Sequence, residues 1–73
     1  MNTKMKAVRK KVQAIDSAAT GRKFRGIRKA AGFGLMEVAT RMGISMTYLS
    51  ELERGSRNWS ETLVELFQHA LSK

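Results

Sequence analysis

Apolar residues recur at helical intervals between Leu35 and Leu52, and one glycine, Gly43, interrupts the pattern. Two short helices that cross steeply can approach closely only where a side chain is small, and Ala39 supplies such a residue. A sharp turn between them needs a residue that tolerates positive φ, and Gly43 supplies it. The pattern predicts helices over 35–42 and from Ser45 to about 53, closed by Gly55, with these residues facing inward: Val38, Ala39, Met42, Ile44, Leu49 and Leu52.

Three further helices are predicted around this pair. An apolar stripe over 4–19 predicts an N-terminal amphipathic helix made by Met5, Val8, Val12, Ile15 and Ala19. The next helix is expected from about Gly21 to Ala31, capped by Thr20 or Ser17, ended by Gly32, and facing inward with Phe24, Ile27 and Ala31. The last helix is expected to be capped by Ser60 and to carry Leu63, Leu66, Phe67, Ala70 and Leu71. No segment has the alternation of a strand, so the chain is predicted to be all-α.

Positive charge is concentrated in the first part of the 73-residue chain, whose net charge is +8. Residues 1–29 contain ten Lys and Arg against one acid, a charge of +9, whereas residues 30–73 contain four against five, a charge of −1. A phosphate backbone or an anionic membrane surface attracts such a cluster, although a solvated basic face is also compatible with it. A core this small without cysteine also favours dimerisation.

Several classes of protein are disfavoured by the composition. No apolar run approaches the roughly 18 residues of a membrane span, and the N-terminus has no signal-peptide block, so a soluble cytosolic protein is expected. The one histidine, His69, has no second ligand spaced to join it, so no metal or other cofactor is predicted. No pair of acidic residues is accompanied by a base suited to catalysis, so no catalytic residue is predicted. An enzyme is therefore the least favoured of the functions considered.

The spacing from Leu35 to Leu52 is that of a DNA-reading helix-turn-helix unit. Together with Phe24-Arg25-Gly26-Ile27-Arg28 and Tyr48-Leu49-Ser50-Glu51-Leu52-Glu53-Arg54-Gly55-Ser56-Arg57-Asn58, it resembles the phage-repressor (XRE or Cro) type of helix-turn-helix protein. The second phrase is also similar to restriction-modification controller proteins. The resemblance covers about residues 22–72 and implies a compact five-helix bundle of the lambda-repressor-like DNA-binding type, here with an extra N-terminal amphipathic helix. We therefore divide the chain into a basic helix over 1–19 and a DNA-binding domain over 20–73.

The resemblance implies that the helix after Ser45 enters the major groove of double-stranded DNA. That geometry exposes Met46, Thr47 and Glu51, which are our base-reading candidates. Thr47 can bond a base edge or touch a thymine methyl, Met46 offers apolar contact, and Glu51 can accept from a cytosine amino group. The alternative is that the three are merely exposed.

Further residues are candidates for contact with the DNA backbone, which fixes a protein on the duplex without reading sequence. Where the family often has a phosphate-holding glutamine this chain has Leu35, so its free backbone amide takes that role. The candidates are Leu35, Ser45, Tyr48, Ser50, Arg54, Arg57, Asn58, Arg22 and Lys23. Tyr48 packing over a neighbouring helix is nearly as good an interpretation. Arg28 and Glu53 match family positions that form a structural ion pair, and Trp59 is expected to cover the core rather than to stack on bases.

The chain is interpreted as a bacterial or phage transcription regulator, most simply a repressor, that binds a palindromic operator as a homodimer. The stripe of Met5, Val8, Val12 and Ile15 is a candidate dimerisation surface, although an arm lying on phosphates and a solvated tail remain open. The alternative function is an antitoxin-like module that binds a partner protein through this stripe and autoregulates through DNA. A basic amphipathic membrane binder is a second rival.

Overall fold

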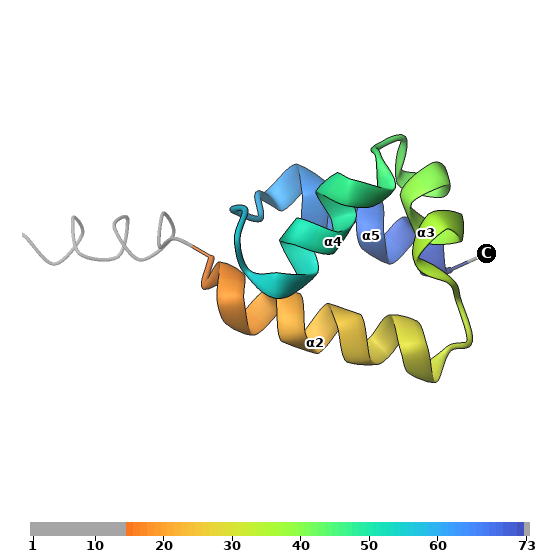
Figure 1. Ribbon diagram of the computed structural model, residues 1–73, viewed down its shortest axis with the longest axis horizontal. Coiled ribbons are helices and arrows are strands. Elements are labelled where there is room, and N and C mark those ends of the chain that lie inside the picture. Colours follow the sequence, from red (N-terminus) through yellow and green to blue (C-terminus); the bar gives the residue numbers. More distant parts are fainter. Residues whose placement is uncertain (1–14, 73) are drawn as a thin grey trace, which may run out of the picture.

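A computed structural model describes residues 15–72, which form four helices and no strand (Figure 1). The helices are α2 (Ser17–Ala30), α3 (Leu35–Met42), α4 (Met46–Arg54) and α5 (Glu61–Leu71). Helix α4 packs against both α2 and α3, and α3 also packs against α5. The all-α prediction is confirmed for these residues. The predicted N-terminal helix falls mainly on residues 1–14, which lie outside the described residues.

Helix α2 begins four residues before the predicted start at Gly21. Its N-cap is Asp16, whose carboxylate accepts a hydrogen bond of 3.1 Å from the Ala19 N–H, so the prediction of Thr20 or Ser17 as the cap is wrong. The Ser17 hydroxyl instead accepts a hydrogen bond of 2.8 Å from the Trp59 N–H. Residues 17–19, which we assigned to the N-terminal helix, therefore belong to α2.

Gly21, the predicted start of this helix, is instead a packing residue. It is buried in the interior of α2, where a Cβ would lie only 2.7 Å from the Glu53 carbonyl oxygen and would also overlap that of Leu52. A side chain here would push the two helices apart. Glycine at this position is what allows α2 to approach the end of α4 closely.

The turns and caps after α2 are as predicted. Gly43 has φ +77° and closes α3 in the left-handed conformation, and Gly55 has φ +82° and does the same for α4. The Ser45 hydroxyl accepts from the Tyr48 N–H at 3.0 Å, and the Ser60 hydroxyl accepts from the Leu63 N–H at 3.1 Å. These bonds satisfy amide donors that a helix start otherwise leaves open.

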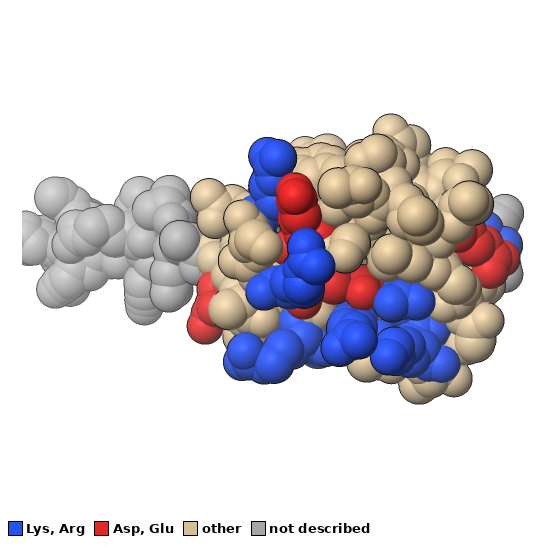
Figure 2. All heavy atoms as spheres, in the orientation of Figure 1, with Lys and Arg blue, Asp and Glu red and all other residues tan. Residues whose placement is uncertain are grey.

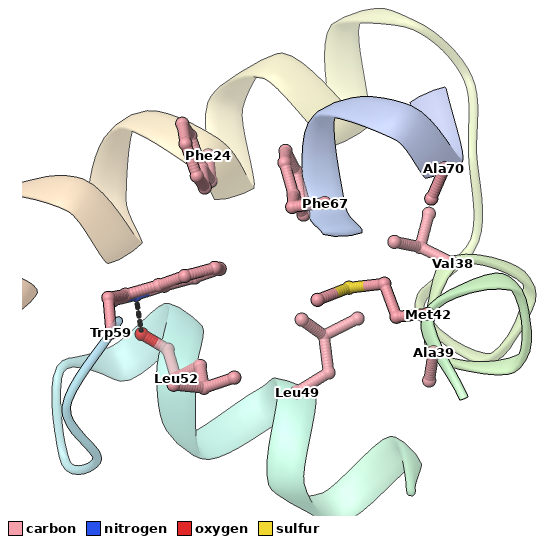
Figure 3. Close-up of a cluster of buried hydrophobic side chains, with 9 residues drawn as sticks. All are labelled: Phe24, Val38, Ala39, Met42, Leu49, Leu52, Trp59, Phe67 and Ala70. Atoms are coloured by element: carbon pink, nitrogen blue, oxygen red, sulfur yellow. Dashed lines mark hydrogen bonds between the residues drawn. The ribbon is translucent and has the colours of Figure 1, made fainter. Parts of the chain in front are cut away.

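All four helices and the loop after α4 contribute to the core (Figure 3). Of the residues predicted to face inward between 35 and 52, Ile44 is half-buried and the others are buried. The core residues are Phe24, Val38, Ala39, Met42, Leu49, Leu52, Trp59, Phe67 and Ala70. The Phe24 ring stacks on Phe67 with centroids 4.3 Å apart, and Trp59 meets both rings edge-on.

Trp59 covers the end of this core, as predicted. Only 4% of it is exposed, and its indole N–H donates a 3.0 Å hydrogen bond to the Leu52 carbonyl (Figure 3). The bond satisfies the one polar atom of the buried ring and ties the loop after α4 back to that helix.

Three residues predicted to be inward are exposed instead. Ile27 is 42% exposed, Ala31 is also exposed, and Leu66 on α5 is 37% exposed. The buried residues of α2 are Gly21, Phe24 and Arg28, so a charged residue takes the inward position beside Ile27. Apolar periodicity alone does not predict that exchange, because it treats arginine as an outward residue.

Candidate nucleic-acid interface

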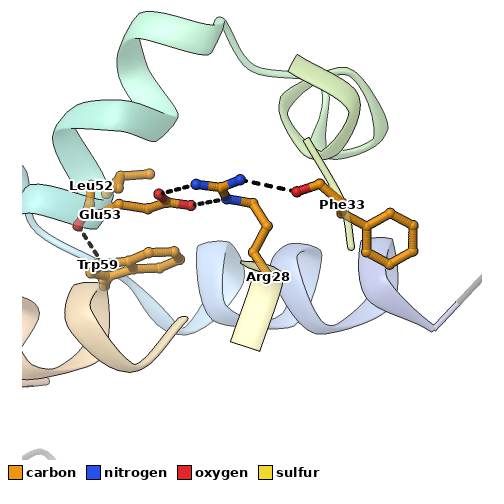
Figure 4. A network of polar contacts seen from close by, with 5 residues as sticks. All are labelled: Arg28, Phe33, Leu52, Glu53 and Trp59. Carbon is orange, nitrogen blue, oxygen red and sulfur yellow. Dashed lines mark hydrogen bonds and ion pairs between the residues drawn. The ribbon is translucent and has the colours of Figure 1, made fainter. Parts of the chain in front are cut away.

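A buried ion pair between α2 and α4 fixes the orientation of α4. The Arg28 guanidinium donates from Nε to Glu53 Oε2 at 2.7 Å and from Nη2 to Oε1 at 2.9 Å (Figure 4). Its Nη1 donates to the Phe33 carbonyl at 3.0 Å, so the same side chain also holds the loop before α3. The predicted structural pair is thus confirmed. Two parallel bonds fix the mutual geometry of α2 and α4 in a way that one point charge would not.

The buried Arg28 stays positively charged. The hydrogen bonds that Arg28 donates to Glu53 raise the pKa of Arg28 above its ordinary value, while burial acts in the opposite direction. A guanidinium already stays protonated at any pH at which proteins are normally studied. The stabilisation by this pair therefore does not depend on deprotonation of Arg28 in that range.

The start of α4 presents the first two base-reading candidates to solvent. Met46 is 45% exposed and Thr47 is exposed, while Leu49 and Leu52 are fully buried against the core. Ser45, just before them, uses its hydroxyl to cap α4. The buried Leu49 and Leu52 and the Ser45 cap therefore fix the position of α4, while the side chains of Met46 and Thr47 stay exposed to solvent.

Glu51, the third base-reading candidate, is engaged with a residue that we assigned to phosphate. The Arg57 Nε donates to Glu51 Oε1 at 2.8 Å, and the Arg57 guanidinium lies 5.4 Å from the centroid of the half-buried Tyr48 ring. The bond that Arg57 donates to Glu51 raises the pKa of Arg57. The two residues are six positions apart across the Gly55 turn, so no helical spacing predicted the contact.

A basic groove of about 560 Å³ lies between α2 and α4. Its cationic side chains are Arg22, Arg25, Lys29 and Arg54, and Figure 2 shows basic side chains gathered along α2 and near the end of α4. Arg22 and Arg54 are among the predicted backbone contacts, whereas Arg25 and Lys29 are not. The spacing of positions 22, 25 and 29 places them on one face of a helix, which is the signal that identifies the group. We call this surface the basic groove.

A smaller hollow of about 260 Å³ continues from the basic groove to the start of α3. Arg25, Arg54 and the Glu53 that is paired with Arg28 line both, whereas Arg28, Leu35 and Ser50 line the hollow alone. The N-cap of α3 is Gly34, which offers no side-chain bond to the first amides of the helix. Open amides beside arginines form a surface suited to an anion such as a phosphate.

The remaining candidates lie apart from this hollow. Asn58 is exposed in the loop after α4, and Lys23 lines a different groove, between α2 and α5. His69 is exposed on α5. Within residues 15–72, no three acid or imidazole side chains gather in a way that could hold a metal ion. None of the four helices is long and apolar enough to cross a membrane.

Comparison with known proteins agrees with this geometry. The model of a family described as a helix-turn-helix domain matches residues 19–71. The comparison with curated proteins gave no match.

Two solved structures are similar over most of the chain. The clp gene regulator ClgR from Corynebacterium glutamicum is 37% identical with a TM-score of 0.77, over 82% of this chain and 78% of that one. The restriction-modification controller protein C.AhdI from Aeromonas hydrophila is 30% identical with a TM-score of 0.73, over 78% of this chain and 86% of that one. From the family match and these two likenesses, we conclude that this chain belongs to the helix-turn-helix domain family of DNA-binding proteins.

Proposed function

We propose that this protein is a transcription regulator, not an enzyme, that binds a palindromic operator as a homodimer and represses transcription from it. The observation that carries the proposal is the exposed start of α4, which presents Met46 and Thr47 to solvent on the same helix whose other end lines the basic groove. An exposed helix start of this kind fits the major groove, and neighbouring cations fit the phosphates on either side.

Base reading is assigned to Met46, Thr47 and Glu51. Thr47 carries a hydroxyl and a methyl group, and both can contact base edges. The Glu51 carboxylate accepts a bond of 2.8 Å from Arg57. It can accept from a cytosine in two arrangements, either with Arg57 still bonded to it or with Arg57 moved to a phosphate. We therefore treat Glu51 and Arg57 as one unit of the interface.

Backbone contact is assigned to the basic groove and the hollow beside it. Arg22, Arg25, Lys29 and Arg54 supply charge, and the amide of Leu35 supplies a donor at the start of α3. Each phosphate neutralised by a cation releases counterions, so binding should weaken steeply as salt rises. The other backbone candidates, Ser45, Tyr48, Ser50, Asn58 and Lys23, remain in the proposal as secondary contacts.

Dimerisation follows from the small reading surface of one subunit. A single helix offers only a few base contacts, whereas two reading helices about 34 Å apart double those contacts and add phosphates. We assign the dimer contact to the apolar stripe of Met5, Val8, Val12 and Ile15, of which only Ile15 belongs to the described residues, where it is half-buried. A dimer on an operator that overlaps a promoter would block polymerase, which is the simplest route to repression.

The test is binding to duplexes drawn from a random pool, followed by titration of the enriched duplex and of a scrambled duplex at several salt concentrations. Sequence preference together with a strong salt slope supports the proposal. Equal affinity for both duplexes, or affinity that does not change with salt, contradicts it. Transcription from a promoter that carries the enriched sequence then tests repression, and increased transcript would show activation instead.

A further inference from the structure

An open groove of about 550 Å³ lies between α2 and α5, on a different side of α2 from the basic groove. Ile15 and Val64 line it, both half-buried and packed against the core, and the buried Phe24 lies at its base. Its wall is therefore partly apolar, with the aromatic cluster directly beneath. We call it the α2/α5 groove.

Two acids border the α2/α5 groove, and neither forms an ion pair with another described residue. They are Glu61 and Glu65, one helical turn apart on α5. The other acids of residues 15–72 are engaged: Asp16 caps α2, and three form the ion pairs Glu37–Arg41, Glu51–Arg57 and Glu53–Arg28. Lys23 is the cation in the groove lining. The groove thus carries an acidic border on a chain whose net charge is +8.

The first 14 residues of the chain have the complementary composition. They contain five cations, Lys4, Lys6, Arg9, Lys10 and Lys11, and no acid. Met5, Val8 and Val12 recur among them at the spacing of one helical face. A basic segment with an apolar stripe fits an apolar groove with an acidic border, because both the burial and the charge favour the contact.

The turn chemistry favours a segment from a second copy over the segment of the same chain. Each turn between described helices contains a glycine with positive φ, namely Gly32, Gly43 or Gly55. The segment of the same chain would have to reverse direction just before α2, where Ala14-Ile15-Asp16 offers no glycine and Asp16 is extended. A segment that arrives from another copy needs no such reversal.

We propose that the α2/α5 groove binds residues 1–14 of a second copy of this chain, each copy inserting its segment into the groove of the other. This inference rests on the proposed homodimer and identifies its interface. Reciprocal exchange gives a two-fold symmetric contact in which the same surfaces serve both subunits. It leaves the basic groove uncovered, because that groove lies on a different side of α2 from the α2/α5 groove, and no residue at the start of α4 lines the α2/α5 groove.

The test uses two full-length variants with opposite charge changes. Glu61→Lys/Glu65→Lys makes the groove border basic. Lys6→Glu/Arg9→Glu/Lys10→Glu/Lys11→Glu leaves Lys4 as the one cation of the segment against four acids and so makes the segment acidic. Within either variant alone, segment and groove then carry like charges, whereas in a mixture each segment meets a groove of opposite charge. Sedimentation without DNA should show the dimer dissociation constant raised at least about tenfold for each variant alone and restored in the mixture. Glu37→Lys, a charge reversal on α3 outside the groove, should leave the wild-type dissociation constant unchanged.

Contrary outcomes are distinct. A wild-type dimer that neither set of reversals weakens places the interface elsewhere and overturns this inference, while the DNA-binding proposal stands if the duplex selection succeeds. A monomeric wild type overturns the exchange and the homodimer together. Weakening in each variant without recovery in the mixture overturns the exchange between copies and favours insertion into the chain's own groove. Circular dichroism checks that each variant is folded. If Glu61→Lys/Glu65→Lys unfolds, Glu65→Lys alone is used in its place, because Glu65 lies beyond the first turn of α5.

Discussion

Arg57 and Glu51 are joined by a 2.8 Å bond from Nε to Oε1 across the turn that ends α4, and the guanidinium of Arg57 also lies against the ring of Tyr48. One member is a base-reading candidate and the other a phosphate candidate. The bond therefore links a side chain that we propose to read a base with one that we propose to contact a phosphate.

Removal of Arg57 should therefore change more than affinity. We expect Arg57→Ala to weaken binding to all duplexes and also to alter the preference at the base pair that Glu51 faces, because its carboxylate loses the group that positions it. Arg54→Ala, an exposed arginine on α4 without a partner among the described residues, should weaken all duplexes alike. Titrations against the enriched duplex and its single-base variants distinguish the two, and equal losses across all duplexes for Arg57→Ala would rule out the linkage.

The buried pair of Arg28 and Glu53 should be essential to stability. Arg28→Leu leaves the Glu53 carboxylate buried without a partner, which costs about 3–5 kcal/mol of unfolding free energy. Arg25→Ala, on the exposed side of the same helix, should change stability by less than about 0.5 kcal/mol. Urea denaturation measures both, and a stability loss of Arg28→Leu no larger than that of Arg25→Ala would refute the structural role.

Two glycines of α2 should respond in opposite directions to the same substitution. Gly21→Ala should destabilise the fold by about 1–3 kcal/mol, because the added methyl overlaps the backbone at the end of α4. Gly26→Ala meets no atom within 4 Å and should stabilise it by about 0.5–1 kcal/mol, because alanine favours the helix. Thermal unfolding of the two variants provides the comparison. Equal changes would mean that α2 and α4 are further apart than described.

Cations of the basic groove should determine the salt dependence of DNA binding. Arg25→Ala and Lys29→Ala should each lower the slope of log affinity against log salt by about 0.9 if the residue contacts one phosphate. Lys23→Ala, on the side of the α2/α5 groove, should change it less. Titrations at four or more salt concentrations measure the slopes, and unchanged slopes for Arg25→Ala and Lys29→Ala would move the phosphate contacts away from this groove.

The sequence predicted the helix pair and its turn because each residue there has a local steric task. Gly43 must adopt positive φ, Ala39 must be small, and Ser45 must cap, so neighbouring residues suffice to identify each role. Gly21 and Ile27 were misjudged because their roles depend on a distant helix: Gly21 faces the backbone of α4, and Arg28 takes the inward place through Glu53. The Glu51–Arg57 bond was missed for the same reason, because it crosses a turn.

We propose that the exposed residues of α4 choose the DNA sequence. A parallel selection of bound duplexes from one random pool, with the wild type and with Thr47→Ala, tests this role. We expect a palindromic sequence with half-sites about one helical turn apart for both proteins, and a changed base preference at one position of each half-site for Thr47→Ala. Identical enriched sequences for the two proteins, or no enrichment by the wild type, would contradict it.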